Sequence, residues 1–239
     1  MKKVFFTLIF ALIFMNNAFA NNKDIDARYI EDCLAIIEKP YLEVSSSYGS
    51  LKYNFDKDED FLRKETVKKY KEQGKVLPAD YKIVGLTKVR QGFEFNMDIG
   101  IIGVSGGKYC VYPKKIYTYI GYYVPTIYIL KDLPKDSCVY DVALRHEKTH
   151  MEIYLHALDY FIPSFKKSVE GLLDKVGVRI ANNIKDAEKK ANILNEEYIK
   201  ELKSDVDAWV KHVEEEQMML DSGENYDLER RICEEVDKK

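Results

Sequence analysis

The residues best suited to chemistry lie in the stretch ALRHEKTHMEIYLHAL, residues 143–158, which holds three of the four histidines. His146 and His150 are four positions apart, and Glu147 follows the first of them. On a helix, such a pair lies about 40° apart around the axis and one turn apart along it, so both imidazoles can reach one ion. The glutamate would then lie beside a water in the open position of a zinc site, as a general base. This H-E-x-x-H pattern predicts a zinc-dependent hydrolase of peptide bonds.

A zinc site of this type needs a third protein ligand, and the sequence offers several candidates. His156 lies ten residues after His146, but Ile153 stands where a glycine would let the helix turn back. Glu170 lies on the next predicted helix, where Asp174 could orient a ligand histidine. The helical segment WVKHVEEEQMMLDSGENY adds three more candidates, which are His212, Glu216 and Asp221. The third ligand therefore stays open, with Glu170, His156 and His212 as the main candidates.

The elements that must position these residues form a sheet-rich part followed by a helical part. Residues 41–56 and 81–104 are rich in alternating β-branched and aromatic residues, which predicts strands, and residues 56–73 predict a surface helix. A helix is expected from Ser137 onward, interrupted at Pro163, and a long helix over residues 183–220. The fold class is therefore α+β, with a mixed sheet packed on the helix that carries His146. We expect a sheet-rich domain over residues 21–162 and a helical region over residues 163–239 packed on it.

The first twenty residues, MKKVFFTLIFALIFMNNAFA, are typical of a cleaved secretory signal peptide. Two lysines precede a short apolar run, and A-x-A ends the segment where signal peptidase reads small residues. This run is too short to cross a bilayer core of roughly 30 Å, and no later stretch is long or apolar enough. We therefore expect an exported protein, periplasmic or secreted, with no membrane span after cleavage.

Charge and cysteine content narrow the possible partners and the compartment of the protein further. The formal net charge is −3 at pH 7, which argues against a nucleic-acid partner because phosphate-binding domains are usually basic. All four cysteines lie beyond residue 20, and an even number in an exported chain predicts disulfides. A β-hairpin that turns near residues 121–124 would pair Cys110 with Cys138, leaving Cys33 for Cys233.

The order of several segments resembles the secreted zinc-dependent proteases of the family designated DUF922. These segments are IVGLT, YC at the start of a strand, TIYIL, SCVYDVALRHEKTH and HVEEEQMMLDSGENY. The resemblance covers residues 81–233 and implies a small zincin-like fold, an exported bacterial hydrolase, and metal or base roles for His146, Glu147 and His150. Members often carry Q-x-x-Y-D-x-x-T-x-H-G near the end. Here Gln217 and Asp221 remain, while Tyr226 stands where the histidine would be.

The sequence therefore predicts an exported, single-zinc metallopeptidase acting on a peptide or protein substrate. Two alternatives remain open. One is a non-catalytic envelope interaction protein with a partner-binding helical tail, which would present a broad apolar patch and no pocket. The other is a metal-binding protein without turnover, whose closed coordination sphere would leave no position for water.

Overall fold

The computed structural model describes residues 27–72, 74–78 and 81–236, so the predicted signal peptide lies outside the described residues. The chain divides into two compact units. Unit 1 consists of the described residues up to Glu43 together with Phe95–Tyr117 and Ser168–Leu202. Unit 2 consists of Val44–Glu94, Thr118–Lys167 and the residues from Lys203 onward. Each unit thus combines segments that are far apart in the sequence.

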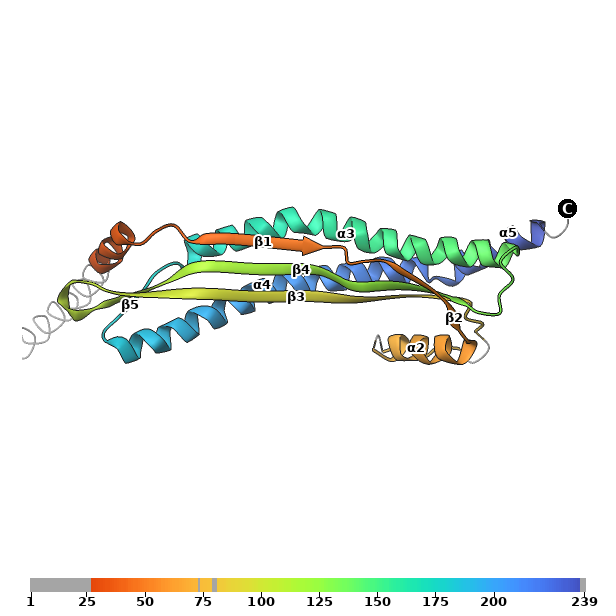
Figure 1. Cartoon of the computed structure of the whole chain (residues 1–239), viewed down its shortest axis with the longest axis horizontal. Coiled ribbons are helices and arrows are strands. Elements are labelled where there is room, and N and C mark those ends of the chain that lie inside the picture. The colour runs from red at the N-terminus through yellow and green to blue at the C-terminus, as the bar shows by residue number, and fades with distance from the viewer. Residues whose placement is uncertain (1–26, 73, 79–80, 237–239) are drawn as a thin grey trace, which may run out of the picture. The chain divides into compact units, whose positions relative to one another are not determined.

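The described elements include both strands and helices, which confirms the expected α+β class (Figure 1). Residues 27–36 are helical and precede the labelled elements. The strands are β1 (Tyr41–Ser47), β2 (Lys52–Lys57), β3 (Gly85–Gly103), β4 (Tyr109–Leu130) and β5 (Arg179–Ala181), with a short 3-10 turn, η1 (Ser105–Gly107). The helices are α2 (Glu59–Glu72), α3 (Cys138–Val176), α4 (Ile184–Leu220) and α5 (Gly223–Val236). The surface helix over residues 56–73 and the long helix over residues 183–220 are thereby confirmed.

Strand β4 organises the sheet, because β1, β2, β3 and β5 all pair with it. The sheet is mixed, since β2 runs parallel to β4, with Lys52 opposite Thr126, whereas β5 runs antiparallel to it, with Cys110 opposite Ile180. The segment Thr126–Leu130 lies inside the sheet, because β2 pairs with it and Val84 accepts a backbone hydrogen bond from Leu130.

The prediction of a turn near residues 121–124 is wrong, because β4 continues through these residues. Gly121 lets β1 approach closely, since a Cβ there would come 2.2 Å from the carbonyl oxygen of Ser47. Val124 adopts a left-handed φ of 46°, a costly conformation for a β-branched residue. The turn-like residues therefore produce a local irregularity within one strand and do not reverse the chain.

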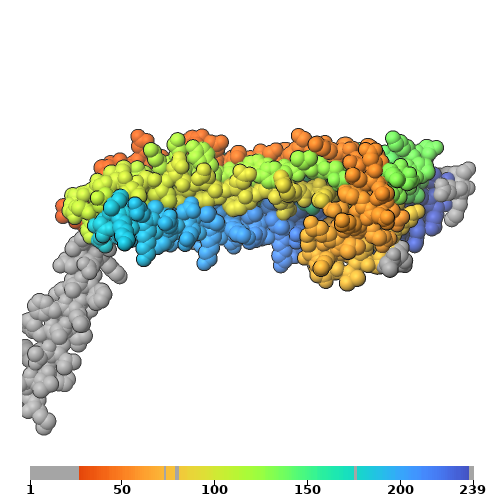
Figure 2. Space-filling model, turned by 60° about the horizontal axis from the view of Figure 1, so that its bottom comes forward, coloured from red at the N-terminus to blue at the C-terminus, as the bar shows by residue number. Residues whose placement is uncertain are grey.

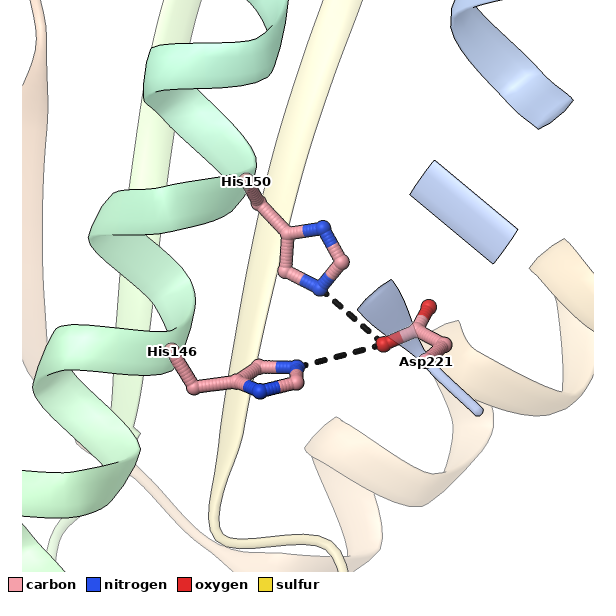
Figure 3. A group of neighbouring side chains, drawn as sticks. All are labelled: His146, His150 and Asp221. Atoms are coloured by element: carbon pink, nitrogen blue, oxygen red, sulfur yellow. Dashed lines mark hydrogen bonds and ion pairs between the residues drawn. The ribbon is translucent and has the colours of Figure 1, made fainter. Parts of the chain in front are cut away.

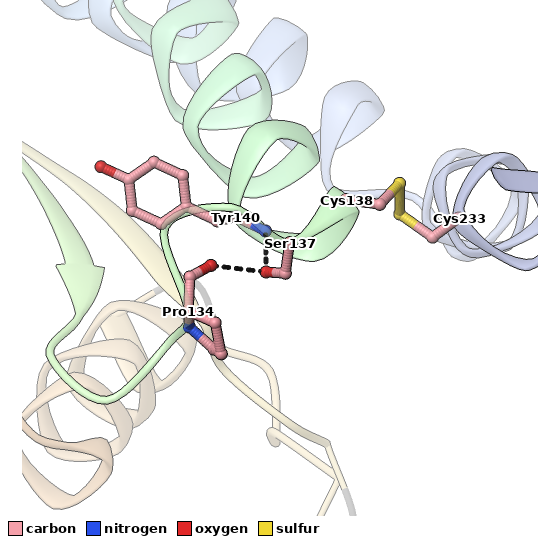
Figure 4. The surroundings of a disulfide bond; sticks show 5 residues. All are labelled: Pro134, Ser137, Cys138, Tyr140 and Cys233. Carbon is pink, nitrogen blue, oxygen red and sulfur yellow. Dashed lines mark hydrogen bonds between the residues drawn. A yellow bond between two sulfur atoms is a disulfide. The ribbon is translucent and has the colours of Figure 1, made fainter. Parts of the chain in front are cut away.

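The disulfide pairing was also predicted wrongly. Cys33 is bonded to Cys110 in unit 1, and Cys138 is bonded to Cys233 in unit 2. Because no turn reverses β4, its first residues and the start of α3 are not brought together as a hairpin would have done. The second bond connects the first residue of α3 to α5 (Figure 4).

Pro163 does not interrupt the helix, contrary to expectation, and α3 continues to Val176. A proline inside a helix costs about 3 kcal/mol, so the surrounding packing must outweigh it. Phe165 is almost fully buried, with its ring 5.3 Å from Phe161. The ring of Phe161 in turn stacks on Trp209 at 5.1 Å. No break in secondary structure therefore marks the expected boundary between residues 162 and 163.

Apolar side chains hold each unit together. In unit 2, Ile127 and Ile129 of β4 pack with Ala143 and Met151 of α3, which fixes the face of α3 that carries the histidines. Leu62 of α2 packs with Ile83 and Leu86, and α2, in orange, forms an outer layer of unit 2 in Figure 2. Among the described residues, none of the helices combines the length and apolarity that crossing a bilayer requires.

Candidate metal centre

Helix α3 presents His146 and His150 from adjacent turns, as their spacing predicts. Ser137 caps the start of this helix, because its Oγ accepts a hydrogen bond from the Tyr140 backbone N–H at 3.2 Å (Figure 4). The two imidazole rings lie 4.8 Å apart, and each histidine is only 4 % exposed. Two histidines buried together must have polar partners, because burial without hydrogen bonds is costly.

Asp221 supplies the common partner of both rings. It follows the last residue of α4, and its Oδ1 lies 3.2 Å from Nε2 of His146 and 3.0 Å from Nε2 of His150 (Figure 3). One ligand atom from each of the three residues lies within 4.8 Å of the others. Two imidazoles and a carboxylate thus converge on one point from α3 and from the junction of α4 with α5.

The spacing of these atoms suits a metal ion. Zinc binds histidine nitrogen and carboxylate oxygen at roughly 2.0 to 2.2 Å, so neighbouring ligand atoms of a tetrahedral site lie about 3.3 Å apart. The nitrogen-to-oxygen distances of 3.2 and 3.0 Å are close to this value. His146, His150 and Asp221 could therefore hold a metal ion.

Other side chains orient both histidines. Nδ1 of His146 lies 3.1 Å from Oε1 of Glu229 on α5. Nδ1 of His150 contacts Oε1 of Gln217, whose amide nitrogen donates to the His150 carbonyl oxygen at 3.0 Å. With Nδ1 of each ring donating outward, Nε2 of each ring keeps a lone pair for an ion.

The charges of the metal-free site place a proton where an ion would bind. Burial opposes protonation of His146, but its hydrogen bond to Asp221 and the charges of Glu147 and Glu229 outweigh burial and raise its pKa to about 9. Desolvation likewise opposes ionisation of Asp221, yet hydrogen bonds from His146 and His150 hold its pKa far below the usual range of an aspartate. A cation that binds here must therefore displace a proton, so its affinity should fall at low pH.

Glu147 has a buried polar atom without a partner at the centre of the site. Glu147 is 6 % exposed, and its Oε2 is buried without a hydrogen-bond partner among the described residues. Desolvation raises the pKa of its carboxyl, opposed by the charge of His150. Gly85 makes room for this side chain, since a Cβ at residue 85 would lie 2.6 Å from Oε1 of Glu147. An unpaired carboxylate oxygen beside two histidines is suited to bind a water or a polar substrate atom.

The three candidate ligands and Glu147 line one cavity of about 130 Å³. Its remaining wall is largely apolar and comes from α2, β3, α3 and the segment before β3. The lining includes Tyr70, Tyr81, Ile83, Leu86, Val139 and Val142, together with Lys69, Tyr226 and Glu229. Small clefts lined by apolar groups around a few converging polar atoms are typical of ligand sites.

Comparisons with protein families, curated proteins and solved structures found no match to this chain.

The candidate third ligands from the sequence stay outside this group. His156 and His212 are exposed, and Glu170 is exposed in unit 1. Helix α3 runs on through Ile153, so His156 is carried roughly 15 Å along the axis from His146. Asp221 was among the further candidates, and it joins the group because α4 ends at Leu220.

Sequence reasoning missed Glu229 and gave Tyr226 no role. Both lie on α5, three residues apart, and therefore on one face of that helix. This spacing was visible in the sequence. Its significance was not, because only folding brings α5 to His146.

Proposed function

We propose that this protein is an exported zinc metallopeptidase with a zincin-like arrangement of its sheet and active-site helix. In this proposal His146, His150 and Asp221 hold the zinc, and Glu147 is the general base. The observation that carries it is the convergence of three ligand atoms next to the buried, unpartnered Oε2 of Glu147. A structural zinc site would use a fourth protein ligand, and among the described residues no fourth His, Cys, Asp or Glu joins the group.

When bound, zinc would acidify a water and polarise the substrate carbonyl. Glu147 would take a proton from the water that attacks the carbonyl carbon, and would later give a proton to the departing amine. The apolar wall excludes water, which strengthens these electrostatic interactions.

The start of β3 offers a place for an extended peptide. Gly85, Leu86 and Thr87 line the cavity, and within the described residues β3 pairs only with β4. A substrate strand could pair with the other edge of β3 and pass Glu147. The two disulfides fit a protein that works in an oxidising compartment outside the cytoplasm.

The test is the zinc content of the purified mature protein, followed by hydrolysis of a peptide library. We expect one tightly held zinc per chain, lost in His146→Ala, His150→Ala and Asp221→Ala. The matched controls are His156→Ala and His212→Ala, because both remove an exposed imidazole from the same helices α3 and α4. A folded, disulfide-bonded protein that takes up no zinc would overturn the proposal and favour the non-catalytic interaction protein. Zinc binding without any hydrolysis would favour the metal-binding alternative.

A further inference from the structure

Tyr226 lies at the metal centre, yet the proposed function gives it no task. Its hydroxyl donates a hydrogen bond to Oδ1 of Asp221 at 2.8 Å and lies 3.5 Å from Nε2 of His146. These distances are similar to the spacing of about 3.3 Å between neighbouring ligand atoms of a tetrahedral zinc site. The hydroxyl therefore lies next to two of the three candidate ligand atoms.

The ring of Tyr226 is held on two sides. It stacks on His146, with ring centroids 5.1 Å apart and planes 26° apart, and the ring of Tyr81 meets it edge-on at 5.4 Å. The same helix α5 is connected to His146 through Glu229 and to the start of α3 through the Cys138–Cys233 disulfide. A hydroxyl fixed in this way needs little reorganisation when charge develops beside it, which is the requirement for an electrostatic catalyst.

Peptide hydrolysis creates the charge that such a donor would stabilise. As the water oxygen bonds to the carbonyl carbon, the π electron pair of the C=O bond moves onto the carbonyl oxygen, and a water proton passes to Glu147. Glu147 is committed to that proton, and Nδ1 of each histidine is committed to Glu229 or Gln217. Among the described hydroxyl groups that line the cavity, only that of Tyr226 has a described hydrogen bond to a candidate metal ligand.

We propose that Tyr226 is a catalytic residue whose hydroxyl donates a hydrogen bond to the oxyanion on the scissile carbonyl. This inference rests on the proposed peptidase function and assigns an oxyanion donor to the site in which Glu147 is the general base. In the substrate-free protein the hydroxyl bonds to Asp221. When substrate enters, it turns to the carbonyl oxygen and keeps its proton throughout.

The rival role for Tyr226 is to position Asp221, and the two roles predict different measurements. The test compares Tyr226→Phe with Tyr160→Phe, which removes a hydroxyl from an exposed tyrosine of α3 that does not line the cavity. For each variant we would measure zinc affinity, kcat and KM for the peptide cleaved fastest, and binding of a phosphinic analogue of that peptide. The phosphinic group imitates the tetrahedral oxyanion.

For Tyr226→Phe we expect a fall in kcat of about 10²- to 10³-fold, as for loss of one oxyanion donor. KM should change by less than about threefold, and affinity for the phosphinic analogue should fall roughly in proportion to kcat/KM. Zinc affinity should stay unchanged, and Tyr160→Phe should resemble the parent protein. The stacked ring remains in Tyr226→Phe, so the fold should be preserved.

Two results would overturn the oxyanion role while leaving the peptidase proposal intact. One is an unchanged kcat in Tyr226→Phe. The other is a weakened zinc affinity with kcat restored at saturating zinc, which would make Tyr226 a positioning residue for Asp221. A parent protein that binds no zinc or cleaves no peptide would overturn the peptidase proposal itself, and this inference with it.

Discussion

Unit 1 and unit 2 bury different kinds of side chain. The core of unit 1 is apolar, with Val169, Leu172, Leu194, Tyr198 and Leu202 among its buried residues. Among the described residues, every buried polar or charged side chain belongs to unit 2. These are Thr66, Thr87, Thr118, His146, Glu147, His150 and Gln217.

This difference indicates where function lies. An unpaired polar group costs roughly 1 to 3 kcal/mol when it is buried, so a fold selected only for stability would fill such positions with apolar residues. Unit 1 follows that rule, whereas five of the seven buried polar residues described in unit 2 line one cavity. Local departures of this kind are expected at functional sites. Substitutions in unit 1 should therefore change stability, and substitutions around the cavity should change chemistry.

The largest effect is expected for Glu147→Gln. The amide keeps the volume of the side chain but cannot take a proton, so peptide hydrolysis should fall by about 10²- to 10⁴-fold. The control is Glu170→Gln, which alters an exposed glutamate of unit 1 on the same helix α3. Activity and zinc content of both proteins would be measured together. An active, zinc-loaded Glu147→Gln would remove Glu147 from the role of general base.

The reverse test truncates the core of unit 1. Leu194 is fully buried and its neighbour Ile193 is 39 % exposed, so they form a matched pair on α4. Leu194→Ala should lower the free energy of unfolding by about 2 to 5 kcal/mol, and Ile193→Ala by about 1 kcal/mol or less. Denaturant unfolding measures both. Zinc stoichiometry should be unchanged in each, and its loss in folded Leu194→Ala would contradict the assignment of metal binding to unit 2 alone.

The disulfides offer a comparison with matched loop lengths. The sequence separations are 77 residues for Cys33–Cys110 and 95 for Cys138–Cys233, so loop entropy predicts similar stabilisation, about 2 to 5 kcal/mol each. Replacing either pair by serine should lower Tm by a similar amount. Only loss of Cys138–Cys233 should also weaken zinc binding, because it releases α5, which carries Glu229. Equal zinc affinities in the two double variants would show that α5 stays in place without its disulfide.

The smallest effect is expected for Gly85→Ala. The added Cβ would meet the buried carboxylate of Glu147 and shift it, which should reduce activity by about tenfold while zinc stays bound. Gly171→Ala is the control in unit 1, because nothing lies within 4 Å of its Cβ position on α3. That variant should gain about 0.5 to 1 kcal/mol of stability and keep full activity. Equal activity in the two variants would mean that Glu147 tolerates displacement.

Local features of the sequence predicted the local features of the structure. The helical spacing of His146 and His150 is a property of any α-helix, and the structure confirms that their rings converge. The long helix over residues 183–220 followed from the period of its apolar residues, and α4 confirms it almost to the residue. The mixed α+β class followed from the same patterns.

Features that depend on distant contacts were predicted poorly. Packing decided that Pro163 lies inside α3, and pairing with β1 and β2 decided that β4 runs through Gly121. The predicted disulfide partners depended on a turn within that strand. Because the turn is absent, both predicted pairs were wrong. In each case tertiary interactions outweighed a local preference of about 1 to 3 kcal/mol.

The sequence by itself determined that His146, Glu147 and His150 would be neighbours on adjacent turns of a helix. Residues three and four apart on a helix lie close together whatever surrounds them. Only the tertiary structure decided that Asp221 completes the group and that Tyr226 and Glu229 contact His146. Those residues lie more than seventy positions away in the chain. Contacts over such separations are fixed by the packing of α4 and α5 in unit 2, and no periodicity in a single segment records that packing.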